Sequence, residues 1–473
     1  MISKPFDRRQ FALLGGAALI AGQARAVSVK SHRLAKPTVR QLAFQDMEVG
    51  AFIHYSIDTY GSLHGQMPAS GFNPADLDAE QWVLAAKAMG AGYVVLTARH
   101  EQGFCLWPTA TTDYSIRNSP YKDGKGDVVR EFVDACRKHG IKPGLYTPPW
   151  IDDNWDTRHG VDISKGNAGI DKYDDPALFA KVRVKEMAQQ HELLTGYGPL
   201  VFYWDDHYGR SDSIGPTPQG GVLRKLYADL GKRSHQLQPG MLYFGPDVEH
   251  VGNEDGHTCY PMWNAIDTLD GTQHSIGTTF KWEGDNMGVP RGHVYRPRLG
   301  STTNGLSTGG WMWTGPRTVQ PLEERMRVYY DMVGRGAGVI INLTPDPSGR
   351  IPDNLVAGAK EIGDEIARRF STPVREVKAT GPVATLRFDA ARRIDHLVAM
   401  ENLIDGQKIA GYVIEAEIDG KWKSLVQGQT VGHKRIDRIS PVTTAAVRFV
   451  CMEALETPVS LRSFAAYDTE ALG

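Results

Sequence analysis

The chain has 473 residues, of which 41% are hydrophobic and 23% are charged. This length accommodates a barrel-sized domain with a smaller accessory domain, and the composition is typical of a soluble globular protein. The formal net charge of −2 gives no reason to expect nucleic acid or an anionic membrane as a partner.

Residues 1–26 have the pattern of an export signal. The paired arginines Arg8 and Arg9 precede an apolar run from Ala12 to Ala21, and a small-residue cleavage site follows at Ala24-Arg25-Ala26. This order is typical of a signal peptide, and the paired arginines indicate the twin-arginine export route of bacteria. We therefore expect a periplasmic or secreted protein with no membrane attachment after cleavage. An N-terminal membrane anchor is disfavoured because the apolar run is too short to span a bilayer.

The four cysteines, Cys105, Cys136, Cys259 and Cys451, show no close spacing of the metal-binding kind. Twin-arginine substrates fold before export, so a disulfide framework is not required. We expect mostly buried thiols.

Predicted strands and helices alternate after the signal. Strands are predicted at Ala51–Tyr55, Gly92–Thr97, Lys142–Thr147, Leu200–Trp204, Met241–Phe244 and Gly338–Leu343. Helices are predicted from Asp76 to Gly90 and from Asp127 to His139. Repeated β-then-α units over roughly 300 residues favour an α/β fold, a (β/α)8-like barrel of the TIM type, regular or distorted, at residues 27–370.

The pattern changes after Phe370. Short alternating strands are predicted at Ala384–Phe388, His396–Met400, Gly411–Ile418 and Ala445–Val450. With no long amphipathic helix between them, they predict a C-terminal antiparallel β-sandwich at residues 371–473. This domain could bind carbohydrate, but a structural role in turns and docking is favoured.

Polar side chains follow the predicted barrel strands at their C-terminal ends. These residues are His54, Arg99, His100, Glu101, Trp150, Asp205, Asp206, Asp247, Glu249 and Glu254. Reactive groups of barrel enzymes lie at this end of the strands. Carboxylates, histidines and tryptophans gathered there are typical of a glycosidase cleft, in which two carboxyl groups flank the scissile bond.

A single carboxylate after a strand is usually a helix N-cap or a surface charge. Asp205 and Asp206 differ because they follow a run predicted to be buried on both faces, where a charge must be paired or functional. A metal site formed by Asp205, Asp206 and His207 is disfavoured, since adjacent strand residues point to opposite sides.

After the signal, the sequence resembles the α-L-fucosidases of glycoside hydrolase family 29. The segments that carry the resemblance include GAFIHYSIDTY, AGYVVLTARHEQGFCLWPTATTDYSI, VFYWDDHYG, GPDVEHVGNEDG and GVIINLTPDPSGRIP. The later stretch ENLIDGQKIAGYVIEAEIDGKWKSL is similar to the β-sandwich that follows the barrel in this family. The pattern is closest to the branch that acts on α-1,3/1,4-linked fucose. It implies a fucosylated oligosaccharide or glycoconjugate glycan as the substrate.

The resemblance also implies catalytic roles. The family nucleophile is an aspartate after a tryptophan or phenylalanine at the end of the fourth strand, which matches Asp205 after Trp204. The GPD…VGNE segment implies that Glu254 is the general acid/base, with Glu249 and Glu283 as alternative candidates. Two-step retaining hydrolysis by such a pair requires no metal or organic cofactor.

Four further residues match family positions that contact the sugar. His54 and His100 match sugar-binding histidines, Trp150 matches a tryptophan beside the cleft, and Trp311 matches the aromatic residue near the sugar methyl group. We expect the tryptophans to pack on the apolar face of the sugar.

Some positions depart from the family pattern. Glu101 stands where the family has a histidine, Asp206 stands where it has a glycine, and Thr308 lies in a segment that has lost an acid and an arginine. Glu101 and Asp206 are therefore candidate substrate-binding residues. Two alternatives remain: a related exo-glycosidase such as an α-L-galactosidase, and a non-catalytic glycan-binding protein, which would have no use for both carboxylates. The sequence says nothing about oligomeric state.

Overall fold

The computed structural model describes residues 33–61, 67–149, 151–163, 175–206, 218–267 and 287–470. The expected export signal at residues 1–26 lies outside the described residues. Trp150, His207 and Glu283 also lie outside them.

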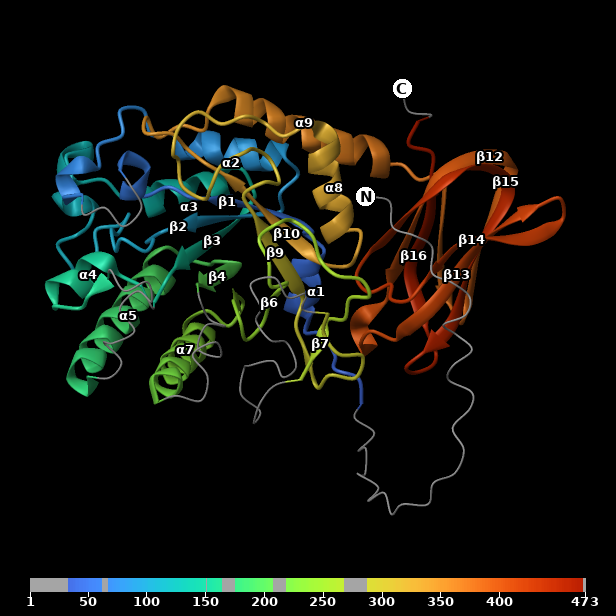
Figure 1. Cartoon of the computed structure of the whole chain (residues 1–473), viewed down its shortest axis with the longest axis horizontal. Helices are drawn as coiled ribbons and strands as arrows, with labels where there is room; N and C mark the ends of the chain where they lie inside the picture. Colours follow the sequence, from blue (N-terminus) through green and yellow to red (C-terminus); the bar gives the residue numbers. More distant parts are fainter. Residues whose placement is uncertain are drawn as a thin grey trace, which may run out of the picture. The chain divides into compact units, whose positions relative to one another are not determined.

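Eight parallel strands form one curled sheet in the order β5-β4-β3-β2-β1-β10-β9-β6 (Figure 1). The strands are β1 (Val49–Ile53), β2 (Tyr93–Thr97), β3 (Lys142–Thr147), β4 (Phe202–Asp205), β5 (Leu242–Tyr243), β6 (Glu249–His250), β9 (Arg298–Thr302) and β10 (Gly338–Leu343). The edges meet at an isolated bridge between Phe244, just after β5, and Val248, just before β6. The expected (β/α) barrel is confirmed, with short strands where its edges meet.

Helix α1 precedes the first strand, and helices follow most of the other strands, as expected for a (β/α) architecture. They are α1 (Val39–Gln45), α2 (Ala79–Ala88), α3 (Val128–Lys138), α4 (Asp153–Arg158), α5 (Pro176–Gly196), α7 (Pro218–Leu237), α8 (Leu322–Met332) and α9 (Asp353–Phe370). The side chains of Asp78 and Asp127 cap α2 and α3 by accepting hydrogen bonds from the backbone N–H groups of Gln81 and Arg130. No helix in the described part of the chain is long and apolar enough to cross a membrane.

The C-terminal region is a six-stranded antiparallel sheet in the order β11-β16-β12-β15-β13-β14. Its strands are β11 (Arg375–Thr380), β12 (Val383–Glu401), β13 (Ile409–Ile418), β14 (Lys421–Gly428), β15 (Arg435–Ala454) and β16 (Ser460–Tyr467). The first half of β12 pairs with the end of β15, and its second half pairs with the start of β15 and with β16. Buried residues from both halves, such as Leu386 and Leu397, share one core. The sheet therefore folds over itself as the predicted β-sandwich.

The strand boundaries of this domain differ from the prediction. Ala384–Phe388 and His396–Met400 are not separate strands but the two ends of β12, and Ala445–Val450 lies inside β15. The polar residues between the two ends of β12 resemble a turn in sequence. They instead continue the strand through irregular pairing, with exposed side chains.

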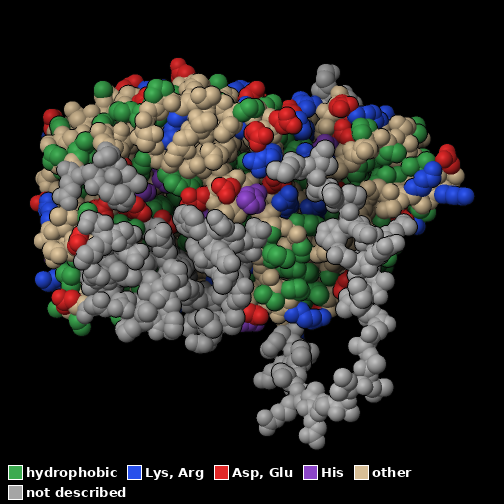
Figure 2. Space-filling view, in the orientation of Figure 1, with side chains coloured by type: hydrophobic (Ala, Val, Ile, Leu, Met, Phe, Trp, Pro, Cys, Tyr) green, Lys and Arg blue, Asp and Glu red, His purple; other side chains and the backbone are tan. Residues whose placement is uncertain are grey.

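The barrel and the sandwich pack against each other. Tyr330 of α8 shares a hydrogen bond of 2.9 Å with the Nε2 atom of His396 in β12. The rings of Phe370, at the end of α9, and Tyr467, at the end of β16, are 5.5 Å apart. Both charge signs are interspersed on the described surface in Figure 2, in keeping with the small net charge.

All four cysteines are free thiols. Cys105 and Cys136 are buried, whereas Cys259 and Cys451 are partly exposed. The expectation of mostly buried thiols therefore holds for two of the four.

Candidate active site

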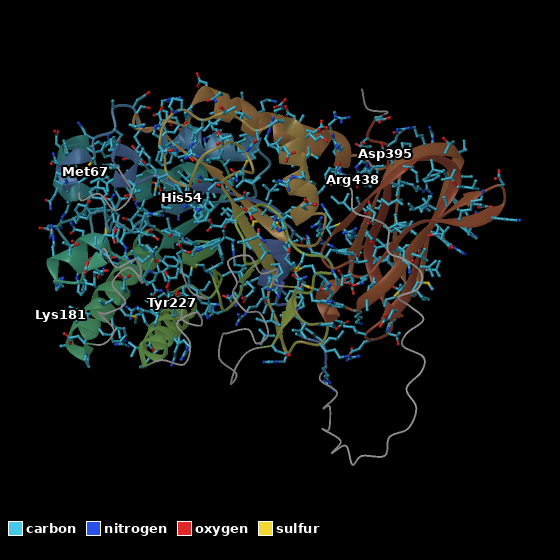
Figure 3. The ribbon with its side chains drawn as sticks, viewed as in Figure 1. His54, Met67, Lys181, Tyr227, Asp395 and Arg438 are labelled. Atoms are coloured by element: carbon cyan, nitrogen blue, oxygen red, sulfur yellow. The ribbon has the colours of Figure 1, made fainter. Side chains whose placement is uncertain are left out.

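A cluster of aromatic and histidine rings lies inside the curled sheet. Phe52 of β1 and Trp204 of β4 have ring centroids 5.2 Å apart, although two strands separate β1 from β4 in the sheet. Strands are spaced about 4.8 Å apart, so this contact crosses the concave side. Tyr146 of β3 is 5.7 Å from Phe52, and Trp311 is 4.7 Å from His54. We call Phe52, His54, Tyr146, Trp204 and Trp311 the ring cluster; Figure 3 labels His54 within the barrel.

The side chain of Asp206 contacts the ring cluster. Trp204 faces inward, and residues two apart on an extended strand share a face. The backbone N–H of Asp206 extends the pairing with β3 by donating to the carbonyl of Thr147 at 2.9 Å. Tyr146 donates its hydroxyl hydrogen to Asp206 Oδ2 at 2.7 Å, and Trp204 Nε1 donates to Oδ1 at 3.2 Å. Two members of the ring cluster thus orient this carboxylate.

Asp205 faces the other side of β4. Its side chain accepts hydrogen bonds from the hydroxyls of Thr147, at 2.9 Å, and Tyr243. The residue is 1% exposed, and burial raises the pKa of its carboxyl to about 7 against the opposing effect of the two hydroxyls. Arg99 and Glu186, a buried ion pair joined at 2.9 Å between the end of β2 and α5, also influence that pKa. Asp205 therefore lies between the sheet and α5, away from the ring cluster.

We expect Asp205→Asn to stabilise the fold in a pH-dependent way. The carboxyl pKa is about 7 when folded and about 3.9 in an unfolded chain, so wild-type stability falls as pH rises through this window. The full difference between the two pKa values corresponds to about 4 kcal/mol of unfolding free energy. The unfolding free energy of the variant, relative to that of the wild type, should therefore increase from pH 4 to pH 7, as measured by urea titration. A pH-independent difference would contradict this assignment.

Asn342 of β10 determines which nitrogen of His54 carries the hydrogen. The amide Nδ2 of Asn342 donates to the carbonyl oxygen of Trp311 at 2.8 Å, and that oxygen can only accept. The Oδ1 atom of Asn342 therefore faces His54 Nδ1, at 2.9 Å, and accepts its hydrogen. Burial, together with nearby His100, lowers the pKa of His54 well below its ordinary value. His54 is thus neutral, with Nε2 as a hydrogen-bond acceptor.

Replacing Asn342 by aspartate tests this tautomer. A carboxylate beside His54 Nδ1 favours the imidazolium ion, so the pKa of His54 should rise and Nε2 should become a donor. We expect the acidic limb of the kcat/KM profile for an α-L-fucoside to move to higher pH by about one unit or more. An unchanged acidic limb would show that the acceptor on His54 is not used.

His100 has the opposite character. Burial disfavours its charge, but the carboxylates of Asp58, Glu101 and Asp206 outweigh this effect, so its pKa is raised. Its Nδ1 atom lies 3.4 Å from Asp58 Oδ2, and its ring stacks on Tyr146 with centroids 5.7 Å apart. The raised pKa favours the protonated form of His100, which donates hydrogen bonds, whereas neutral His54 accepts them; their rings are 5.7 Å apart. Such a pair suits neighbouring hydroxyl groups of a bound sugar.

Glu254 lies in the loop after β6 and connects to the ring cluster through Trp311, whose Nε1 donates to Glu254 Oε2 at 3.0 Å. The alternative candidate Glu249 is paired with Arg296 at 2.7 Å. Glu249 is thus held by a charged partner rather than by a member of the ring cluster. Of the two described candidates for the acid/base, Glu254 is the one with a hydrogen bond from Trp311 of the ring cluster.

The metal site considered for Asp205, Asp206 and His207 is not supported. The carboxylates of Asp205 and Asp206 lie on opposite faces of the extended chain, and His207 lies outside the described residues. Within the described ranges, no group of three or more histidine, cysteine or acidic side chains is arranged to hold a metal ion.

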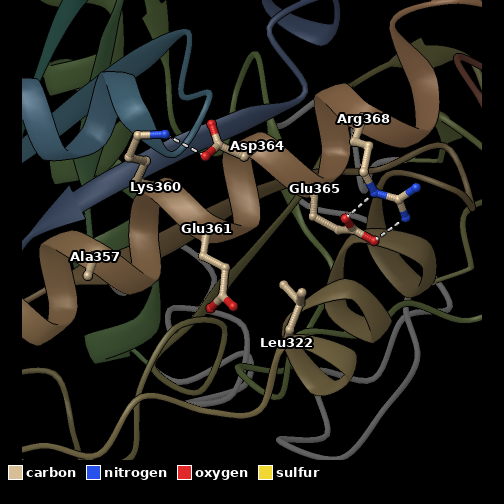
Figure 4. Close-up of a pocket in the computed structure, with 7 residues that line it drawn as sticks. All are labelled: Leu322, Ala357, Lys360, Glu361, Asp364, Glu365 and Arg368. Atoms are coloured by element: carbon tan, nitrogen blue, oxygen red, sulfur yellow. Dashed lines mark hydrogen bonds and ion pairs between the residues drawn. The ribbon is translucent and has the colours of Figure 1, made fainter. Parts of the chain in front are cut away.

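A surface pocket between α8 and α9 is separate from the ring cluster (Figure 4). It is lined by Leu322, Ala357, Lys360, Glu361, Asp364, Glu365 and Arg368. Lys360 pairs with Asp364 at 2.5 Å and Arg368 pairs with Glu365 at 2.7 Å. Since these charges are satisfied within α9, the pocket offers no reactive group.

Comparison with known proteins decides the family. A family model described as Alpha-L-fucosidase matches residues 59–368. The chain belongs to the α-L-fucosidase family. It is therefore a glycoside hydrolase of the α-L-fucosidase type, and its substrate class is a fucosylated glycan.

Relatives of this fucosidase cover most of its length. Alpha-L-fucosidase 1 of Arabidopsis thaliana is 29% identical, over 89% of this chain and 86% of the relative. A crystal structure from Bacteroides thetaiotaomicron, provisionally named an α-L-fucosidase, superimposes with a TM-score of 0.78 at 30% identity, over 92% of this chain and 99% of that one. A glycoside hydrolase 29 family member from an unknown rumen bacterium gives a TM-score of 0.76 at 29% identity, over 92% and 78% of the two chains.

The structure adds one residue to the site that sequence reasoning missed. His250, at the end of β6, has its ring 6.0 Å from Trp204. Its Nδ1 atom accepts from the backbone N–H of Gly252 at 3.1 Å, so Nε2 carries the hydrogen and donates to Ser301 Oγ at 3.0 Å. Burial lowers the pKa of His250 to about 4 despite nearby Asp206, so its ring is neutral. In the sequence, the position of His250 four residues before Glu254 could have indicated that it lies in the site.

Proposed function

We propose that this fucosidase is a retaining exo-enzyme that removes terminal L-fucose with Asp206 as its nucleophile and Glu254 as its acid/base. Asp206 takes the role that the sequence comparison gave to Asp205. The observation that carries the proposal is the opposite orientation of the two neighbours: Tyr146 and Trp204 of the ring cluster hold Asp206, whereas Asp205 is buried behind the sheet.

The reaction proceeds in two steps. A carboxylate oxygen of Asp206 attacks the anomeric carbon while Glu254 transfers its proton to the departing glycosidic oxygen. Glu254, now ionised, takes a proton from water, and the resulting hydroxide attacks the same carbon. The proton taken from water returns Glu254 to its acid form, and the attack releases Asp206 as a carboxylate. Two inversions at one carbon give net retention.

The ring cluster supplies the contacts that a deoxy sugar needs. Neutral His54 accepts a hydrogen bond from one sugar hydroxyl through Nε2. The neighbouring residue His100, whose raised pKa favours its protonated form, donates one to a neighbouring hydroxyl oxygen. Trp311, which is partly exposed and lies 6.0 Å from the ring of buried Phe52, offers apolar surface to the ring carbons and the methyl group of fucose. Trp150 remains a proposed member of this wall.

We further propose α-1,3/1,4-linked fucose as the natural linkage and a periplasmic or secreted location, both on the sequence patterns described above. A panel of oligosaccharides with α-1,2, α-1,3, α-1,4 and α-1,6 fucose tests the linkage. Preferential release from the α-1,3 and α-1,4 members is expected. Preference for another linkage, or for an α-L-galactoside over the matching α-L-fucoside, would contradict it.

Retention is tested by proton NMR during hydrolysis of an aryl α-L-fucoside. The anomeric signal of α-L-fucose should appear first, and β-L-fucose should grow only at the rate of mutarotation. Initial formation of β-L-fucose would establish inversion and exclude a glycosyl-enzyme intermediate on Asp206.

A further inference from the structure

A buried carboxylate lies directly behind His100. The side chain of Asp58 is 0% exposed, and its Oδ2 atom lies 3.4 Å from His100 Nδ1. Among the described residues, neither carboxylate oxygen of Asp58 has a hydrogen-bond donor of good geometry, and His100 is the basic side chain at ion-pair distance. A buried carboxylate without a charged or hydrogen-bonded partner is costly. The negative charge of Asp58 and a positive charge on His100 therefore stabilise each other.

The fold brings these two residues together from neighbouring strands. Asp58 lies in a short 3-10 helix, η3 (Ile57–Tyr60), in the turn after β1, and His100 lies in the turn after β2. Strands β1 and β2 are adjacent and parallel. Their ends are also joined by a hydrogen bond of 3.1 Å, which the backbone N–H of Tyr55 donates to Thr97 Oγ1. The contact between Asp58 and His100 is thus built into the C-terminal end of the barrel.

The orientation of the His100 ring directs one nitrogen to Asp58 and the other away from it. The ring stacks on Tyr146, with an angle of 16° between the two ring planes. Nδ1 faces the carboxylate. Nε2 lies on the other side of Cε1 and therefore points away from Asp58. The His100 side chain retains 9% of its exposure, whereas that of Asp58 retains none, so a ligand can reach His100 but not Asp58.

The charge of His100 decides what its Nε2 atom can do. A carboxylate beside Nδ1 keeps a hydrogen on that nitrogen. In a neutral ring Nε2 would then be an acceptor, as it is in His54, whereas in the imidazolium ion both nitrogens donate. A negative charge this close favours the ion. Asp58 therefore makes the two histidines different, one an acceptor and the other a donor.

We propose that Asp58 is a positioning residue for sugar binding: as the counter-ion of His100, it keeps both ring nitrogens protonated, so that Nε2 donates to a sugar hydroxyl oxygen. This inference rests on the sugar-binding role proposed for His100. Asp58 itself never touches the sugar. The other described titratable groups around the His100 ring are His54, Tyr146, Glu101 and Asp206.

The variant Asp58→Asn tests the ion pair, because asparagine keeps the shape and an acceptor oxygen but removes the charge. An NMR titration of the full-length protein with carbon-13-labelled histidine rings measures the pKa of His100, and His100→Gln identifies its signal. In the wild type, the pKa should lie above the ordinary histidine value of about 6.5, and in Asp58→Asn it should fall. A wild-type pKa below the ordinary value, or an unchanged pKa in the variant, would overturn the proposal.

Kinetics test whether this charge serves the sugar. On a nitrophenyl α-L-fucoside, whose leaving group needs no proton from Glu254, kcat/KM should fall as the pH rises through the pKa of His100, because the donor is then lost. Asp58→Asn should move this basic limb to lower pH by about one unit or more. An equal loss of activity at every pH would show that Asp58 acts on the fold alone, and the proposal would be wrong.

Asp395→Asn is the matched control. It removes another buried carboxylate that is paired with a histidine, His396, at 2.7 Å, but this pair lies in the C-terminal sandwich. The basic limb of this variant should coincide with that of the wild type. If Asp58→Asn lowers the pKa of His100 but leaves the limb in place, the sugar-binding role of His100 is contradicted. An unchanged pKa contradicts the ion pair itself, so the two failures are distinguishable.

Discussion

Replacing Asp206 by glycine is expected to lower kcat on an aryl α-L-fucoside by about a thousandfold or more, because no other group can form the glycosyl-enzyme bond. The matched neighbour variant Asp205→Asn is expected to keep kcat within about tenfold of the wild type. Asparagine retains an acceptor oxygen for Thr147 or Tyr243 and removes a carboxyl group that does not face the sugar. Initial rates on the same substrate measure both effects.

Azide distinguishes a missing nucleophile from a damaged fold. In Asp206→Gly the ion can occupy the vacated space, attack the anomeric carbon directly and form β-L-fucosyl azide, the product of a single inversion. Asp205→Asn should show no azide-dependent product. The opposite pattern, an active Asp206→Gly and an inactive Asp205→Asn rescued by azide, would return the nucleophile role to Asp205.

Replacing Glu254 by alanine is expected to lower kcat/KM on phenyl α-L-fucoside by about 10²- to 10⁴-fold, the usual contribution of a general acid. On a nitrophenyl fucoside the first step should be nearly normal and the second slow, because water then lacks its base. Azide needs no base, so it should accelerate turnover and give α-L-fucosyl azide, with retained configuration.

Glu249→Gln is the control for Glu254. Its carboxylate is engaged with Arg296, so its removal should change stability more than leaving-group dependence. A steep leaving-group dependence in Glu249→Gln, together with a normal one in Glu254→Ala, would exchange the two assignments.

Local patterns in the sequence were sufficient for much of the barrel. The strand predicted at Lys142–Thr147 is β3, and the helix predicted from Asp127 is α3, whose N-cap is Asp127 itself. Strand β9 was not predicted because RLGST is polar in composition although all five residues are buried. Some of its polar groups bond to residues distant in sequence, such as the Trp263 carbonyl that accepts from Arg298 Nε at 3.0 Å.

The site shows the same division between local and long-range information. The motif predicted a reactive carboxylate at the end of β4, but two aspartates, Asp205 and Asp206, stand there. Which one faces inward depends on the direction of Trp204, and that direction is set by its contact with Phe52 across the barrel. Side chains alternate along a strand, so Asp205 and Asp206 point to opposite faces of the sheet. The alternation does not determine which of the two points into the barrel.

The most direct test of the nucleophile is to trap its covalent intermediate. Glu254→Ala should react with α-L-fucosyl fluoride, whose fluoride leaves without a general acid, and then accumulate the ester because its hydrolysis lacks a base. Peptide mass spectrometry with fragmentation between residues 205 and 206 locates the added deoxyhexose. The geometry predicts the adduct on Asp206. An adduct on Asp205, or fluoride release with no adduct on either aspartate, would contradict it.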